Sequence, residues 1–64
     1  MRLSEFWRRM DVALGAAYST SWASDHVVGG LGGRTVAQAL ANGVDAKVVW
    51  RAVCDELRLP RSAR

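Results

Sequence analysis

The stretch VDAKVVWRAVCDEL, residues 44–57, decides the fold, because it carries the clearest helical pattern in the chain. Asp45 is placed to cap the first turn, and Pro60 prevents much continuation at the other end. Between them the apolar residues recur every three or four positions, as on one face of a helix: Val49, Trp50, Val53, Cys54 and Leu57. The stretch therefore predicts an amphipathic helix that packs its apolar face on the rest of the chain.

Working back from this stretch, Thr35 and Gln38 have the spacing of a capping box, which begins a short helix that Asn42-Gly43 ends. Residues 29–33, which include four glycines, end any regular structure before it. A further helix is expected over residues 16 to about 28, with these residues facing inward: Ala17, Tyr18, Trp22 and Val28.

The first helix is expected to start at Ser4, which can act as its N-cap, and to stop at Gly15. Its apolar stripe consists of Phe6, Trp7, Met10, Ala13 and Leu14. No alternation typical of strands is apparent. The predicted fold is all-α, a compact bundle of three to four short helices, with one domain over residues 1–59 and a flexible basic tail over residues 60–64.

Size and composition limit the possible functions. The chain has 64 residues, half of them apolar, which suits a single small domain with a rich core. Cys54 is the only cysteine, so an internal disulfide and a multi-cysteine metal site are excluded and a reducing cytoplasm is expected. No apolar run approaches the length of a membrane-spanning helix, and we expect no membrane association.

No catalytic constellation is recognisable. His26 lacks a convergent partner, because neighbouring Asp25 points elsewhere on a helix, and a structural or surface role is favoured. Cys54 lies toward the C-terminal half of its helix, where the dipole disfavours a thiolate, and is interpreted as a buried apolar residue. We expect no enzyme activity, no cofactor and no metal.

Two helices carry unusually little charge. Asp25 is the one charged residue between positions 16 and 33, and residues 35–44 carry none. Such faces are typical of protein association, although a chain this short needs most of its apolar residues for its own core. The large aromatic residues are the candidate anchors for a protein partner: Tyr18, Trp22 and Trp50.

Nucleic-acid binding is the alternative. The net charge of +3 comes from the two ends of the chain, and residues 35–53 have a partial helix-turn-helix pattern. Asp45 and Trp50 at positions expected to approach DNA weaken this interpretation. The glycine run before Arg34 resembles an anion cradle only weakly, because no Walker-type lysine follows. The candidate phosphate contacts are Arg34, Lys47 and Arg51.

A series of short motifs covers nearly the whole chain: residues 1–7 (MRLSEFW), 15–18 (GAAY), 21–23 (SWA), 25–27 (DHV), 31–36 (LGGRTV), 39–40 (AL), 43–45 (GVD) and 49–54 (VWRAVC). Together they resemble an actinobacterial family of short proteins that consist of a domain of unknown function. The sequence departs from the pattern mainly at Gly29-Gly30, where a more helical pair is expected.

The resemblance implies a small helical cytoplasmic protein, often encoded near the homologous-recombination recombinase and its regulator, and supplies no catalytic residues. Our leading hypothesis is a non-enzymatic protein-interaction or regulatory module. The alternative is a weak nucleic-acid-binding module, with a possible link to DNA repair. The sequence predicts neither the partner nor the oligomeric state.

Overall fold

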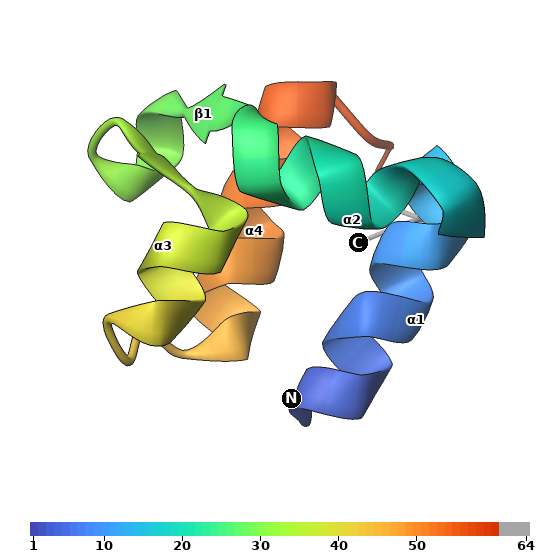
Figure 1. Ribbon diagram of the computed structural model, residues 1–64, viewed down its shortest axis with the longest axis horizontal. Helices are drawn as coiled ribbons and strands as arrows, with labels where there is room; N and C mark the ends of the chain where they lie inside the picture. The colour runs from blue at the N-terminus through green and yellow to red at the C-terminus, as the bar shows by residue number, and fades with distance from the viewer. Residues whose placement is uncertain (61–64) are drawn as a thin grey trace.

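The computed structural model describes residues 1–60, so most of the predicted tail lies outside the described residues. The helices are α1 (Leu3–Leu14), α2 (Ala16–Asp25), α3 (Val36–Ala41) and α4 (Ala46–Leu57). Between α2 and α3 lie β1 (Val27–Val28), a 3-10 turn η1 (Gly29–Leu31) and β2 (Arg34–Thr35) (Figure 1). The predicted class, a small helical bundle, is confirmed, with the addition of two short strands.

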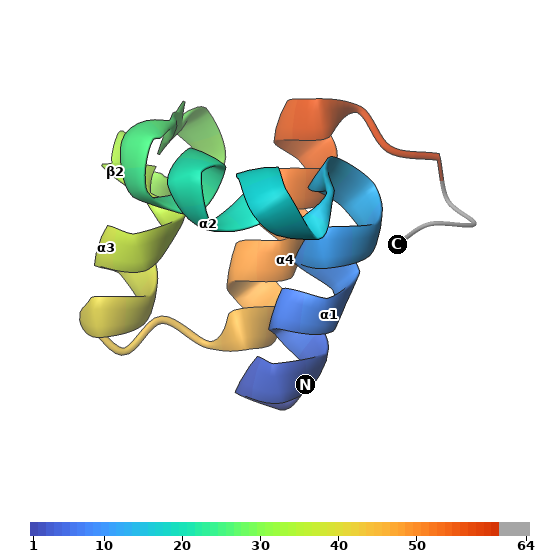
Figure 2. The same ribbon diagram turned by 45° about the vertical axis from the view of Figure 1, so that its right-hand side comes forward.

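The helices enclose one core. In Figures 1 and 2, α1 and α4 run in the same general direction, with both N-terminal ends at the lower end of the view, and α2 crosses near their upper ends. The predicted faces of α1 and α4 supply most of the large buried side chains, which are Phe6, Met10, Val49, Trp50, Val53 and Cys54. The amphipathic patterns of these two helices are thus confirmed.

Of the three N-caps that the sequence predicts, the structure contains two. The Thr35 hydroxyl accepts from the Gln38 backbone N–H at 3.1 Å, and the Gln38 side chain accepts from the Thr35 N–H at 3.0 Å. Asp45 accepts from the Lys47 N–H at 2.9 Å. The expectation for Ser4 is wrong: the N-cap is Arg2, two residues earlier, which makes no side-chain bond, and α1 begins at Leu3.

The end of α2 differs from the expectation. The helix stops at Asp25 rather than near residue 28, because β1 pairs with β2 as an antiparallel ladder, with Val27 opposite Thr35. The pairing buries Val28 and satisfies backbone groups that a longer helix would also have satisfied. Gly32 and Gly33 reverse the chain at positive φ of 70° and 80°, which side chains rarely adopt.

The inward face of α2 also differs. Ala17 and Tyr18 face solvent, whereas Ser19, Trp22 and Ala23 are buried. A buried hydroxyl needs a hydrogen-bond partner, and the Ser19 Oγ donates to the Asp11 Oδ1 of α1 at 2.5 Å. This bond lies on the buried side of α2 with Trp22 and Ala23, and Tyr18 lies on the exposed side.

Gly30 lies in close contact with α4. A Cβ built at this position would lie 3.2 Å from the Ala52 Cβ of α4, whereas one at Gly29 would meet nothing within 4 Å. The turn η1 therefore packs its backbone directly on α4, and a small residue at position 30 permits that close approach.

Candidate functional site

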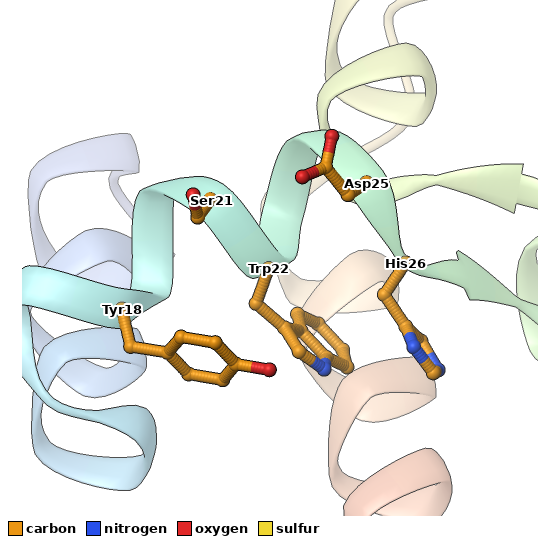
Figure 3. A pocket seen from close by; sticks show the side chains of 5 residues that line it. All are labelled: Tyr18, Ser21, Trp22, Asp25 and His26. Carbon is orange, nitrogen blue, oxygen red and sulfur yellow. The ribbon is translucent and has the colours of Figure 1, made fainter.

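The exposed face of α2 carries an aromatic pocket of about 250 Å³, which we call the Tyr18 pocket and which is lined by Tyr18, Ser21, Trp22, Asp25 and His26. The spacing of these residues by three or four positions places them along one side of the helix and its C-cap. Figure 3 shows the rings of Tyr18, Trp22 and His26 projecting to the same side of α2. The structure thus brings two predicted partner-binding residues together.

Within this pocket, Trp22 and His26 form a rigid pair. Their rings stack at a centroid distance of 4.7 Å and an interplanar angle of 13°. Trp22 is 7% exposed and belongs to the core, so it supports the stack from below. Tyr18, in contrast, is 56% exposed and presents most of its ring to solvent.

His26 has a partner that the sequence did not reveal. Its Nε2 lies 2.9 Å from the Glu56 Oε2 of α4, thirty positions along the chain, and both side chains are partly exposed. The expectation that Asp25 does not serve as the partner and that His26 is a surface histidine agrees with this geometry. No local pattern could have found Glu56, because the contact depends on how α2 crosses α4.

The pair changes the acidity of Glu56. The hydrogen bond from His26 holds the pKa of the Glu56 carboxyl below its ordinary value of 4.5, and the charge of His26 and the Gly29 backbone amide act in the same direction. Burial opposes this shift but does not overcome it. The ionised carboxylate is therefore the form that the folded protein favours.

Trp50, the third aromatic candidate, lies elsewhere. It is 5% exposed, and its ring meets Phe6 edge to face at a centroid distance of 6.2 Å. Its Nε1 is buried and makes no hydrogen bond within residues 1–60. Because the indole fills the space between α1 and α4, Trp50 offers little surface to a partner and is not part of the Tyr18 pocket.

A second hollow, of about 320 Å³, lies between α1 and α4. We call it the cationic cleft; it is lined by Met1, Arg9, Lys47, Trp50, Arg51 and Cys54. It brings the predicted phosphate contacts Lys47 and Arg51 together with Arg9, which no pattern in the sequence singles out. Arg34 is apart from them, in a pocket lined by Gln38, Ala41 and Asn42.

The residues considered for catalysis do not converge. His26 lines the Tyr18 pocket and pairs with Glu56, whereas Cys54 is buried and lines the cationic cleft. In the described part of the chain, no three His, Cys, Asp or Glu side chains are grouped so that they could hold a metal ion. Across residues 1–60, the helices fall short of the length and apolar character that crossing a bilayer requires.

Comparison with known proteins places the chain in a family. It is similar to a Mycobacterium tuberculosis (strain ATCC 25618 / H37Rv) protein described as a "putative envelope-preserving system protein", with 45% identity over 38 residues. That match covers 59% of this chain and 14% of the mycobacterial protein. No solved structure matches. A family model matches residues 1–62, and the chain belongs to the family described as "Protein of unknown function (DUF3046)".

Proposed function

We propose that this chain is a non-enzymatic protein-interaction module that binds its partner through the face of α2 around Tyr18. The observation that carries the proposal is the exposure of Tyr18 beside a pocket whose other walls are held in place. A tyrosine offers a large apolar surface and a polar tip, which is why it recurs among residues that dominate binding energy.

The surroundings of Tyr18 favour binding because they are already ordered. Trp22 is packed in the core, His26 stacks on it, and the His26–Glu56 pair ties the end of α2 to α4. A partner that docks here would lose little conformational entropy on the side of this protein. The pocket can therefore act as a preformed socket next to an exposed ring.

The desolvation free energy of the rest of the exposed α2 surface is also small. Its exposed residues are small or hydroxylated, with Asp25 as the one charge: Ala16, Ala17, Thr20, Ser21, Ser24 and Asp25. Removing such groups from water costs less than removing lysines or glutamates, which are depleted at interface centres. This composition supports a protein partner in preference to a polyanion.

The test is a comparative capture experiment in extracts of the native organism. We expect at least one protein to be retained by the wild type, lost with Tyr18→Ser and kept with Val12→Ser. Val12 is 84% exposed on α1, so its replacement is a matched loss of exposed apolar surface outside the Tyr18 pocket. A set of retained proteins that is identical for all three chains would contradict the proposal.

Two groups of proteins are the first to seek among those retained. The resemblance noted in the sequence implies genes near a recombinase and its regulator, which makes DNA-repair proteins one group. The description of the mycobacterial relative makes components of envelope maintenance the other. A cytoplasmic location is part of this proposal and rests on the single cysteine.

Nucleic-acid binding is the second candidate function, favoured by the grouping of Lys47 and Arg51 with Arg9 in one cleft. A titration of the ¹⁵N-labelled protein with short duplex and single-stranded DNA tests it. Salt-sensitive shifts at Lys47 and Arg51 would support it, because phosphate contacts weaken as salt rises. An unchanged spectrum would exclude nucleic-acid binding as a candidate function.

A further inference from the structure

The cationic cleft is a second concave surface, separate from the Tyr18 pocket. Arg9 reaches it from α1, and Lys47 and Arg51 reach it from consecutive turns of α4. Within residues 1–60, Arg9 pairs with Glu5 at 3.4 Å, whereas Lys47 and Arg51 form no ion pair. Lys47 and Arg51 thus line the hollow as exposed cations without an ion-pair partner among residues 1–60.

The placement of these two cations works against the stability of α4. Like charges four positions apart repel each other on a helix surface. Lys47 also lies in the first turn, where the helix dipole is positive and favours acidic residues. Figure 2 shows α1 starting at the same end of the molecule as α4, which adds a second positive helix end there. An anion in the cleft would relieve all three effects.

The walls of the cleft indicate which kind of anion fits. Trp50 and Met1 give the cleft an apolar component, but Trp50 is buried and leaves no ring face on which a base could stack. The Trp50 N–H is shielded from water, and we assign it no ligand contact. Glu5 pairs with Arg9, which leaves Lys47 and Arg51 as a short patch of two cations and not a long stripe that could follow a phosphate backbone.

We propose that the cationic cleft binds an acidic segment of a protein partner, with carboxylates on Lys47 and Arg51 and an apolar side chain toward the exposed Met1. This inference extends the proposed interaction function to a second surface, which uses none of the residues of the Tyr18 pocket. Charge complementarity of this kind chiefly accelerates association and fixes orientation.

The experiment is an NMR titration of the ¹⁵N-labelled full chain with a hexaglutamate peptide at low salt. We expect shifts of the amides around Arg9 and over residues 47–51. In the double variant Lys47→Gln/Arg51→Gln the peptide should bind about tenfold more weakly or not at all. Arg34→Gln removes an exposed cation outside the cleft and should bind like the wild type. A thermal melt of each variant verifies folding, which loss of like-charge repulsion should not impair.

Parallel titrations with inorganic phosphate, hexathymidylate and a short DNA duplex separate the alternatives. Stronger binding of hexaglutamate than of any phosphate-bearing probe supports the inference. Stronger binding of either nucleic acid would assign the cleft to nucleic acid and overturn it, as would phosphate binding equal to that of the peptide. Absence of peptide shifts in the cleft, or shifts that persist in the double variant, would also overturn it. None of these outcomes depends on Tyr18.

Discussion

At the scale of single residues, the Ser19 hydroxyl contributes to the orientation of α2, together with the buried side chains of Trp22 and Ala23. It is fully buried, and the bond that it donates to Asp11 is the polar link between α1 and α2. If the hydroxyl is removed, the exposed Asp11 carboxylate can form a hydrogen bond to water instead. The bond to Ser19 is nevertheless lost, and a small void remains in its place. The contribution is therefore that of one charge-assisted hydrogen bond, partly offset by the better helix propensity of alanine.

We expect Ser19→Ala to lower the free energy of unfolding by about 1 kcal/mol. Ser24→Ala, an exposed change on the same helix, should leave it within about 0.5 kcal/mol of the wild type. Urea unfolding followed by tryptophan fluorescence measures both. Equal stabilities for the two variants would show that the bond does not hold α2 in place.

Arg58 is a second residue whose conformation affects stability. It ends α4 in the left-handed region, at φ 54°, and is the one non-glycine residue with positive φ among the described residues. Glycine adopts this conformation without the Cβ penalty. Arg58→Gly should therefore raise the free energy of unfolding by about 0.5–1 kcal/mol.

Arg58→Ala is the control, because it removes the same charge but keeps a Cβ. We expect no gain in stability from it. If alanine stabilises as much as glycine in thermal unfolding, the effect comes from charge and not from backbone conformation.

At the scale of elements, the contact between η1 and α4 depends on two backbones coming close. A methyl group at position 30 would press on Ala52, and α4 is a packed helix that cannot easily move away. We expect Gly30→Ala to be less stable than Gly29→Ala by about 1 kcal/mol or more, measured by urea unfolding. Gly29→Ala has open space and is the matched control. Equal stabilities would mean that η1 does not pack on α4 as described.

The His26–Glu56 pair between α2 and α4 makes the free energy of unfolding depend on pH. The pKa of Glu56 is lowered in the folded state, so its contribution to stability is present above the ordinary carboxyl pKa of 4.5. That contribution is lost as the pH falls through the lowered value. We expect the wild type to exceed Glu56→Gln in stability at neutral pH and the difference to shrink in acid.

Urea unfolding of both proteins at neutral and acidic pH measures this difference. Asp25→Asn removes an exposed carboxylate next to His26 that is not the partner of its ring and serves as the comparison. A difference between wild type and Glu56→Gln that is constant with pH would contradict a lowered Glu56 pKa.

At the scale of the whole molecule, the sequence predicted what depends on neighbours in the chain. The Thr35–Gln38 capping box, the Asp45 cap and the buried face of α4 follow from spacing alone, and the structure contains all three. The early end of α2 could not be predicted this way, because it depends on Val27 and Val28 pairing across a turn.

The candidate site shows the same division. Tyr18 and Trp22 could be selected as large aromatics, but their difference in exposure depends on how α2 is rotated against the core. The His26–Glu56 pair, and the position of Arg9 beside the α4 cations, depend on contacts between helices that are far apart in sequence. Trp50 was a candidate partner contact because it is a large aromatic residue, but it is buried in the core. A chain of 64 residues has few other large side chains to fill that core.

The central claim, that the Tyr18 surface binds a protein, is tested most directly by calorimetric titration of the captured partner with wild type, Tyr18→Ser and Val12→Ser. We predict that Tyr18→Ser raises the dissociation constant by about tenfold or more, as expected for a central aromatic anchor, and that Val12→Ser binds with the affinity of the wild type. Equal affinities for all three proteins would contradict the claim.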